Sequence, residues 1–376
     1  MERKTFNVEI AALGRPVSIG QLYNNYTGKF SNQSTLNQSL IDDNVRGRKS
    51  EKRYLEMLRS DILSEKFETL KVAPASKLNI LSEIGVIPLE YSGRFLDDEP
   101  ESDKILRRSM LYICYTYKED LKFHAIQECI STEAFQREVK DTSSTHVVTG
   151  TTWGVYSFVS VECTIDDESS RLQEVEKINE ILNKIKISVE CDKPKASEEL
   201  SREVNLMKYT FKIINDISVK RSLTFETAVE CLRCVMGMVE NTNDSKGYQL
   251  VYRIYSLSEM RKSSKASVVG GMHPARKTHV NRFSDNEIEQ VVSTFELISV
   301  AKQKLNGNNR PGDQKQTTDH STRVQSFEES IKNLRSGLKQ LIDEKRYPDL
   351  KKLIDQFNSG IMAEIESYLS SMIGFI

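Results

Sequence analysis

One very long β-type run dominates the sequence, residues 143–164, which read SSTHVVTGTTWGVYSFVSVECT. The run is rich in Val, Thr and aromatic residues and contains no proline, a composition typical of strands. At about 3.3 Å per residue, an unbroken strand of this length would span roughly 70 Å. A strand so long needs a large sheet built around it, so we expect this run to decide the fold.

Two glycines interrupt this run, Gly150 and Gly154, and Trp153, the only tryptophan in the chain, lies between them. A glycine inside a strand is typical of a bend, a bulge or the close approach of another backbone. We therefore predict that the sheet has a hinge at Gly150, Trp153 and Gly154.

A charged helical segment follows the long run, within residues 165–205. Apolar residues recur there three or four positions apart, as on one face of a helix. They are Leu172, Val175, Ile178, Ile181, Leu182 and Ile185. Residues 184–191 also alternate between apolar and polar, so this part is left open between helix and strand. Strand, helix and strand patterns then follow over residues 205–218, 224–239 and 248–257.

A second helical pattern precedes the long run, over residues 51–70. Its apolar residues, three to five positions apart, are Leu55, Leu58, Ile62, Phe67 and Leu70. Strand-like segments follow at residues 85–90 and 108–117. The arrangement predicts an α+β fold in which a bent central antiparallel sheet is flanked by two helical clusters.

The last part of the chain is purely helical in pattern. Ser284 and Glu287 have the spacing of a capping box, and Pro348 stands at the start of the last helix. Short loops between amphipathic helices are typical of antiparallel packing in a small bundle. We therefore divide the chain into an α+β domain at residues 1–260, a basic linker at 261–283 and an all-α helical bundle at 284–376.

The composition excludes several classes of protein. The chain has 376 residues, and its 53 Lys and Arg nearly balance its 54 Asp and Glu. A net charge of −1 gives no overall field that attracts nucleic acid, so we expect no nucleic-acid partner. Charges interrupt every apolar stretch before the ~18 to 20 residues that a membrane-spanning helix needs. Residues 1–10 carry no apolar core of a secretory signal, which predicts a cytoplasmic protein or one released without a signal peptide.

No arrangement of residues indicates an enzyme. The chain lacks the phosphate-binding, dinucleotide-binding, zinc-protease and serine-hydrolase motifs. Cys231 and Cys234 form a lone C-x-x-C without a second pair, and two ordinary cysteines are the favoured interpretation over a zinc site. His124 and Glu128 are interpreted as an ordinary helix pair. We predict no catalytic residue, no cofactor, no metal site and no small-molecule substrate.

Several short segments, spread over nearly the whole chain, form an ordered set. They are ALGRPVSIGQLY at 12–23, YSGRFLDD at 91–98, THVVTG at 145–150 with Trp153 and Gly154, LTFETAV at 223–229, YRIYSL at 252–257 and YPDL at 347–350. In order and spacing this set resembles the stonustoxin family, the fish venom cytolysins and their non-venom relatives. The resemblance assigns Gly14, Arg15 and Pro16 to the family's N-terminal turn, with a structural role.

The resemblance implies a domain of the perforin and cholesterol-dependent cytolysin (MACPF/CDC) type, followed by a bundle similar to a focal adhesion targeting domain. In this family the first domain oligomerises, with itself or with a related subunit, and inserts β-hairpins into a lipid membrane. The helical clusters at about 51–70 and 165–205 are then expected to become strands, and the protein to become membrane-associated after oligomerisation. The candidate membrane-segment residues are Leu55, Leu58, Ile62, Leu172, Val175, Ile178, Ile181 and Ile185.

Charge in the first helical pattern argues against insertion there. A lipid-facing strand alternates apolar and polar residues, and a central Arg or Lys on the lipid side costs roughly 2 to 4 kcal/mol. Neither alternating face of residues 51–70 is free of charge, so this segment fits a soluble helix better. The competing hypothesis is a non-lytic cytosolic scaffold that keeps the fold and uses the bundle to recognise partners.

Overall fold

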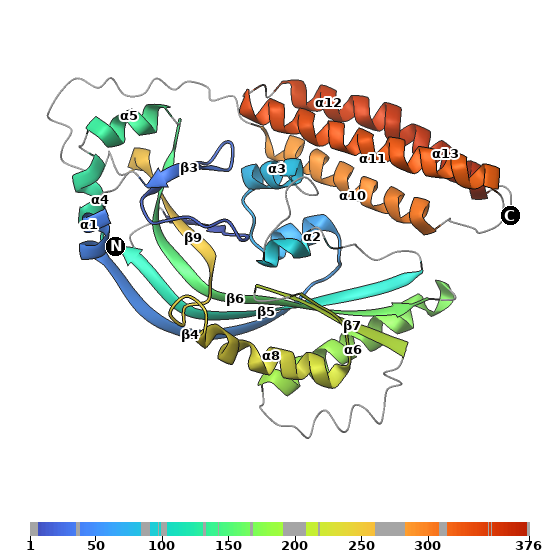
Figure 1. Ribbon diagram of the computed structural model, residues 1–376, viewed down its shortest axis with the longest axis horizontal. Helices are drawn as coiled ribbons and strands as arrows, with labels where there is room; N and C mark the ends of the chain where they lie inside the picture. Colours follow the sequence, from blue (N-terminus) through green and yellow to red (C-terminus); the bar gives the residue numbers. More distant parts are fainter. Residues whose placement is uncertain are drawn as a thin grey trace.

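A long, bent antiparallel sheet organises the computed structural model, with helices on both faces and a helical bundle along one arm (Figure 1). The structure describes residues 7–34, 38–83, 91–96, 98, 104–130, 133–141, 143–165, 168–190, 208–216, 219–259, 283–307, 314–344, 346 and 348–373. Within these residues the sheet has nine strands. They are β1 (Asn7–Ala11), β2 (Gln21–Asn24), β3 (Lys29–Ser34), β4 (Val45–Met57), β5 (Ile105–Leu121), β6 (His146–Thr164), β7 (Tyr209–Asn215), β8 (Val219–Leu223) and β9 (Tyr248–Ser256).

The long strand β6 holds the sheet together because it changes neighbours along its length. It pairs with β5 over most of its length, and β5 pairs in turn with β4. On the same side as β5, the first residues of β6 pair with β2 of the β2–β3 hairpin. On the other side, the first half of β6 pairs with β9 and the second half pairs with β7. The prediction that residues 143–164 form one long strand is confirmed, since β6 covers all but the first three of them.

Helices cover the two faces of the bent sheet unequally. The concave, inner face carries α2 (Leu63–Thr69), α3 (Pro74–Glu83) and the short η1 (Tyr91–Phe95). The convex, outer face carries α6 (Arg171–Glu190), preceded by η2 (Glu168–Ser170), and α8 (Phe225–Glu240). Around the far end of the sheet lie α1 (Gln38–Asn44), α4 (Phe123–Ile130) and α5 (Glu133–Asp141).

Alternation along the strands builds two separate cores. Leu111 and Phe158 point to the inner face, where they share one buried cluster, the inner core, with α2, α3 and the bundle. Their neighbours Tyr112 and Val159 point to the outer face and pack in a second cluster, the outer core, with α6 and α8. Burial on both faces explains why β6 lacks a polar stripe.

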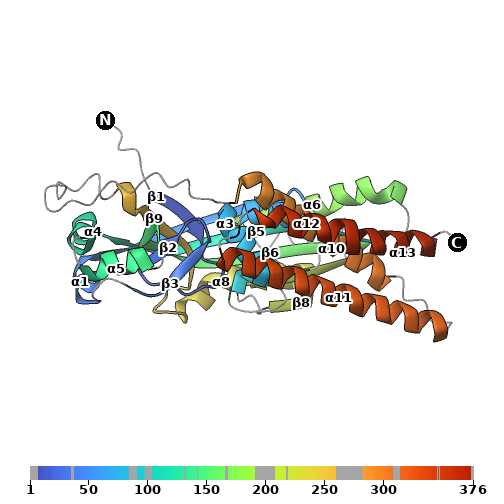
Figure 2. The ribbon, with the colours of Figure 1, turned by 90° about the horizontal axis from the view of Figure 1, so that it is seen from above.

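The bundle consists of long helices that lie above the inner face. They are α10 (Asp285–Gly307), α11 (Gln314–Asp343), α12 (Asp349–Phe357) and α13 (Ala363–Ile373), with one π-helical turn, η4 (Asn358–Met362), between the last two. Seen from above, they run lengthwise over the arm formed by β5 and β6 (Figure 2). The predicted capping box is present, since the Glu287 amide donates to Ser284 Oγ at 3.2 Å and the Ser284 amide donates to Glu287 Oε2 at 2.7 Å.

The helix predicted over residues 51–70 is wrong in its first half. Residues up to Met57 belong to β4, which pairs antiparallel with β5, and α2 begins only at Leu63. As an edge strand β4 leaves most of its charged side chains in water, so they cost little, while Leu55 and Met57 pack at the margin of the outer core. Strand pairing therefore overrides the helix-like spacing of this segment.

The remaining element predictions fare better. The open choice at residues 184–191 is resolved as helix, because α6 continues to Glu190. The strands predicted within 205–218 and 248–257 are β7 and β9, and the helix predicted at 224–239 is α8. The strand predicted at 85–90 and residues 261–282 of the linker lie outside the described residues.

Candidate functional site

The predicted hinge coincides with a cluster of irregularities in strand pairing. The register between β5 and β6 shifts between Tyr115 and Tyr117 of β5, opposite Gly154 and Trp153. The register between β6 and β9 shifts twice, once on each side of residues 150–152. Because a bulge bends its strand and increases the local twist, three of them within a few residues account for the bend of the sheet (Figure 1).

Close backbone approach makes both glycines necessary at this bend. A Cβ atom on Gly154 would lie 1.9 Å from the carbonyl oxygen of Cys114. In the same way, a Cβ atom on Gly247 would lie 2.5 Å from the carbonyl oxygen of Gly154. A Cβ on Gly150 would lie 2.7 Å from the Glu119 carbonyl oxygen. Each of these contacts is to a backbone oxygen, so rotating a side chain cannot relieve it. The close backbone approach expected from the sequence is therefore present at Gly150 and Gly154.

Side chains from three segments also meet at the bend. The Trp153 indole Nε1 donates to Glu119 Oε2 at 2.8 Å, and Lys246 Nζ binds Glu119 Oε1 at 2.9 Å. The Lys246 ammonium group lies 5.6 Å from the Trp153 ring centroid and 5.1 Å from that of Tyr117, within range of a cation–π interaction. The hydrogen bond to Glu119 raises the pKa of Lys246. Glu119 and Lys246 escaped the sequence analysis because only the fold brings them to Trp153.

The N-terminal turn fastens the start of the chain to the sheet. Leu13 and Gly14 both adopt positive φ angles, 52° and 75°, which turn the chain after β1. Arg15 closes the turn by donating from Nε to the Ala12 oxygen at 3.0 Å and from Nη2 to the Ala11 oxygen at 2.9 Å. Pro16 is exposed beside these contacts. These contacts support a structural role for Gly14, Arg15 and Pro16, because the Arg15 side chain bonds its own turn and the Arg15 carbonyl oxygen accepts a hydrogen bond from the Tyr252 hydroxyl of β9.

Two long connections leave the sheet at the same end. The first, residues 58–104, joins β4 to β5 and is called here the first insert. The second, residues 165–208, joins β6 to β7 and is called the second insert. Register brings their four ends together, because Met57 lies opposite Met110 near the start of β5, and Thr164 lies opposite Ile105. The four strands β4 to β7 thus form an antiparallel sheet with one helical insert in each outer connection.

The first insert lies on the inner face, between the sheet and the bundle. Leu58 is buried in the inner core, whereas Ile62 is 45% exposed. Leu55, predicted to belong to the same helix, lies instead in β4. The structure therefore separates the three candidate membrane-segment residues of this region rather than placing them on one helix face.

The second insert lies on the outer face, where α6 packs on the sheet and on α8. Ile178, Ile181 and Ile185 are fully buried in the outer core, and Val175 packs at its margin. Leu172 is 80% exposed and does not share that face. The helix spacing read from the sequence is therefore correct for four of the five candidate residues in this insert.

A carboxylate fixes the beginning of α6 to the sheet. Glu174 accepts hydrogen bonds from the Tyr209 hydroxyl at 2.9 Å and from Lys177 at 2.9 Å, and Lys208 lies 3.1 Å away. Burial opposes ionisation of Glu174, but these hydrogen bonds outweigh burial and lower its pKa to about 2. Glu174 therefore stays ionised, and it holds the second insert at one polar point.

The described residues offer no site for metal chemistry. No group of three or more His, Cys, Asp and Glu side chains among them could hold a metal ion. Cys231 and Cys234 are free thiols. No helix in the described part of the chain is both long and apolar enough to cross a bilayer.

A bent antiparallel sheet with two helical inserts leaving one end defines a protein of the MACPF/CDC class. A family model described as SNTX, MACPF/CDC-like domain matches residues 7–271, and the chain belongs to this family. Verrucotoxin subunit beta and neoverrucotoxin subunit beta of Synanceia verrucosa are each 24% identical over 240 residues, which cover 62% of this chain and 33% of each relative. The chain thus matches about a third of the length of these relatives.

The solved stonustoxin structure has the same fold. It superposes with a TM-score of 0.61 at 14% sequence identity, and the match covers 97% of this chain and 47% of stonustoxin. The likeness extends beyond the sheet into the bundle, since nearly all of this chain is covered. The fold predicted from the sequence, a bent sheet with two helical clusters followed by a helical bundle, is confirmed.

Proposed function

We propose that this protein is a cytolysin-type pore former that assembles into oligomers and perforates lipid membranes. In this proposal the two inserts leave their seats and become β-hairpins that extend β4–β5 and β6–β7. The observation that carries the proposal is the common end from which both inserts leave the sheet, between strands that are already paired antiparallel, β4 with β5 up to Met57 and β6 with β7 up to Cys163. Each hairpin would need only to continue a register that exists.

The corrected position of β4 removes the part of the objection to insertion that concerns residues 51–57, whereas Arg59, Asp61, Glu65 and Lys66 remain in the first insert. The charges of Glu51, Lys52 and Arg53 weighed against a membrane role for residues 51–70, but these residues belong to the sheet, which stays in water. The hairpin itself would come from residues beyond Met57. The unfavourable cost of burying a central cation in lipid then no longer applies to β4.

The second half of α6 has the pattern that a barrel strand requires. Residues 181–189 place Ile181, Asn183, Ile185, Ile187 and Val189 on one side of an extended strand and Leu182, Lys184, Lys186 and Ser188 on the other, so the alternation is complete from Lys184 onward. Transmembrane strands alternate in this way between lipid and lumen. In the helix, Ile181 and Ile185 satisfy their apolar surface in the outer core, so the same residues suit both states.

The proposal also covers the oligomeric state, the location and the lack of enzymatic activity of the protein. We infer a homo-oligomer or an assembly with a related subunit, because the named relatives are themselves subunits. The hinge at Gly150, Trp153 and Gly154 would let the two arms of the sheet move, and the clustered bulges support this role. We infer no enzymatic activity and action at membranes after release. The non-lytic scaffold hypothesis is not favoured, because it gives the two inserts no purpose.

A reversible cross-link on the second insert tests this proposal. The Arg233 guanidinium of α8 donates to the Ser188 carbonyl of α6 at 2.6 Å, a contact that spans a longer distance than a direct disulfide bridges. A bis-methanethiosulfonate reagent therefore oxidises cysteines at these two positions into a bridge of two disulfides, which joins the helices and is cleaved by a thiol reductant. The variant carries Ser188→Cys and Arg233→Cys, with serine at Cys129, Cys191, Cys231 and Cys234. We expect the reduced form to release dye from phosphatidylcholine vesicles with cholesterol or phosphatidylserine, and the oxidised form to bind without release.

Each single-cysteine variant under the same oxidation is the matched control. Equal dye release by the oxidised and reduced double variant would contradict conversion of the second insert. No release by the unmodified chain from any of these vesicles would contradict the proposed function itself.

A further inference from the structure

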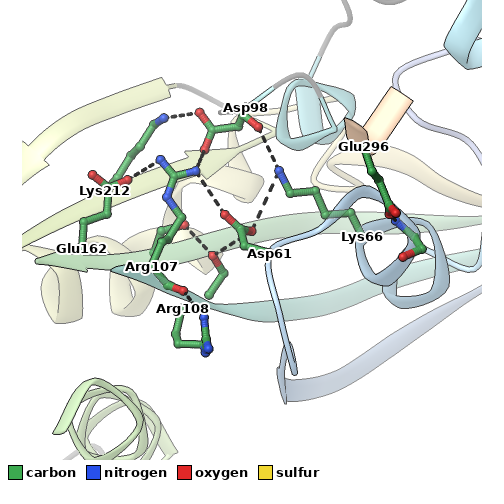
Figure 3. Close-up of polar contacts among 11 residues, drawn as sticks. Asp61, Lys66, Asp98, Arg107, Arg108, Glu162, Lys212 and Glu296 are labelled. Carbon is green, nitrogen blue, oxygen red and sulfur yellow. Dashed lines mark hydrogen bonds and ion pairs between the residues drawn. The ribbon is translucent and has the colours of Figure 1, made fainter. Parts of the chain in front are cut away.

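A network of six charges, three of them buried and three partly buried, joins the first insert to the sheet (Figure 3). Three of its members come from the insert and three from three different strands, and their formal charges cancel. The members are Asp61, Lys66 and Asp98 of the insert, with Arg107 of β5, Glu162 of β6 and Lys212 of β7. Except for Asp98, which ends the family segment at 91–98, none of them was singled out from the sequence, and pore formation alone does not require them.

Arg107 stands at the centre of this network. Its Nη1 atom lies 2.8 Å from Asp98 Oδ2 and 3.2 Å from Asp61 Oδ2, and its Nη2 atom contacts Glu162. Lys66 Nζ donates to the Asp98 carbonyl at 2.9 Å and lies 3.9 Å from Asp61 Oδ1. Every ion pair of the network therefore either crosses from the insert to the sheet or orients a group that does, apart from the contact within the sheet between Arg107 and Glu162.

The centre of the network is shielded from water, and its attachment of the first insert to the sheet depends on that shielding. The Asp61 side chain is 0% exposed and that of Lys66 is 2% exposed. Burial raises the pKa of Asp61 and lowers that of Lys66, because loss of hydration outweighs the attraction of the neighbouring opposite charges. Buried ion pairs whose desolvation exceeds their attraction give a specific geometry more than a strong one. Such a network holds only as long as water stays out.

The bundle is the element that closes over this part of the insert. Helix α10 packs on α2, which carries Lys66, and both helices contribute to the inner core. Glu296 of α10 accepts a hydrogen bond from the Ser64 amide at 2.8 Å, beside Lys66 in Figure 3. Glu289 of the same helix binds Lys77 of α3 at 2.6 Å. The first insert is thus covered by the bundle on the side away from the sheet.

The second insert is seated differently. The main contacts of α6 are with β5, β6 and α8. Its polar attachment at Glu174 uses Lys177 and Lys208, whose side chains are 52% and 43% exposed and already hydrated. Movement of the bundle would therefore change the surroundings of the first insert and leave those of the second insert unchanged.

We propose that the helical bundle is an intramolecular lock on the first insert, and that it acts by keeping the six-charge network dry. Displacement of α10 admits water, the charges exchange each other for hydration, and the first insert leaves the sheet. The second insert is released independently of the bundle. The lock rests on the proposed function for its purpose at the membrane, but it is a property of the protein in water.

Hydrogen exchange of the full chain in solution tests the lock. In the variant Glu289→Gln/Glu296→Gln, we expect exchange within residues 63–83 to accelerate about tenfold, because two charge-assisted contacts to the bundle are weakened. Exchange within α6 stays unchanged. The matched control is Glu180→Gln, which weakens the 2.9 Å ion pair with Lys184 on the second insert and leaves residues 63–83 unaffected.

A second variant tests the role of the charges rather than of the contacts. Asp61→Asn/Lys66→Met removes one charge of each sign from the dry part of the network and leaves the formal total unchanged. Adding Glu289→Gln/Glu296→Gln to this background is expected to leave exchange within residues 63–83 close to that of the background. If the acceleration persists in full, hydration of the network is not the release mechanism and the lock as stated is overturned.

Two further results would also overturn the lock. They are an unchanged exchange rate within residues 63–83 in Glu289→Gln/Glu296→Gln, and an equal acceleration in α6. Because no lipid is present, the outcome is independent of pore formation. Vesicle leakage with a negative exchange result leaves the proposed function standing and removes the lock, whereas the reverse pair of results removes the proposed function and leaves the lock.

Discussion

The two inserts occupy equivalent positions in the chain and opposite positions in space. Each joins two antiparallel strands at the same end of the sheet, yet the first lies under the bundle on the inner face and the second lies on the outer face. The first is attached through a buried charge network, and the second through an apolar helix face with one carboxylate at its rim. Topology thus decides where an insert can extend, whereas the contacts that hold the insert decide what releases it.

The residues that hold the two inserts are expected to contribute to stability in different ways. A buried charge network fails when one member is removed, because the others remain charged in a dry site. An apolar seat fails gradually, by the size of the cavity that a substitution leaves. The bend of the sheet lies outside both seats and affects the two inserts together.

Substitution at the bend is expected to have the largest effect on the free energy of unfolding, and it should affect both inserts together. Gly154→Ala places a Cβ atom 1.9 Å from a backbone oxygen, so we expect a loss of more than about 4 kcal/mol in the free energy of unfolding, visible by urea denaturation. Gly237→Ala in α8 is the control, because its Cβ meets nothing within 4 Å and alanine favours the helix. Equal stability of the two variants would refute the close approach at the bend.

Removing Arg107, the centre of the charge network, should distinguish the first insert from the second most clearly. Arg107→Met leaves Asp61 and Asp98 without their main partner, and we expect a loss of about 3 kcal/mol. The lower end of the usual range applies because Glu162 is 21% exposed and can be hydrated. Protease cleavage should become faster within the first insert and not within α6. Faster cleavage in both inserts would show that the network stabilises the whole domain.

A cavity in the outer core should loosen the other insert alone. Ile185 is fully buried, so Ile185→Ala is expected to cost about 2 to 3 kcal/mol in the stability of α6 on its seat. Hydrogen exchange should increase in α6 and remain constant in residues 63–83. Leu172→Ala, at an 80% exposed position on the same helix, serves as the control and should change neither.

Acid should separate the two inserts with a smaller effect. The pKa of Glu174 lies at about 2, below its ordinary value of 4.5, so its contribution is present above pH 4.5 and is lost as the pH falls toward 2. Asp61 acts in the opposite sense, because its raised pKa means that protonation on acidification relieves a buried charge. The protection factors of α6 amides should therefore fall on acidification, whereas protonation of Asp61 should not lower the protection factors of the first insert.

The Glu174→Gln variant provides the reference for this pH effect. We expect it to cost about 1 kcal/mol at neutral pH, since partly exposed lysines donate two of the three contacts. The protection factors of its α6 amides, which correct for the intrinsic pH dependence of exchange, should no longer depend on pH between about 4.5 and 2. A pH dependence that persists in Glu174→Gln would assign the effect to another group.

Local patterns were sufficient to predict the parts of the fold that depend on local patterns. The strand around Gly150 and Gly154, the buried face of α6 and the capped helices of the bundle could all be read from composition and spacing. The edge strand β4 could not, because solvent exposure on both faces lets charges replace the alternation that normally marks a strand. Leu55 and Leu58 consequently suggested a helix that the chain does not form there.

The polar sites could not be predicted because they are assembled from distant segments. Asp61 and Asp98 lie in connections, and only the fold brings them to Arg107. Glu119 and Lys246 meet Trp153 across 34 and 93 residues of sequence for the same reason. No local spacing marks such residues, and a charged side chain in a sequence is far more often exposed than buried.

An environment-sensitive fluorophore placed in turn at each of residues 181–189 tests directly whether the helical second insert becomes a membrane strand. The full chain carries one such cysteine, with serine at the remaining cysteines except the buried Cys114 and Cys163. On vesicles that leak, we predict that emission alternates with a period of two residues, with positions 181, 183, 185, 187 and 189 in lipid. A period near 3.6 residues, or no transfer to lipid during leakage, would contradict the account.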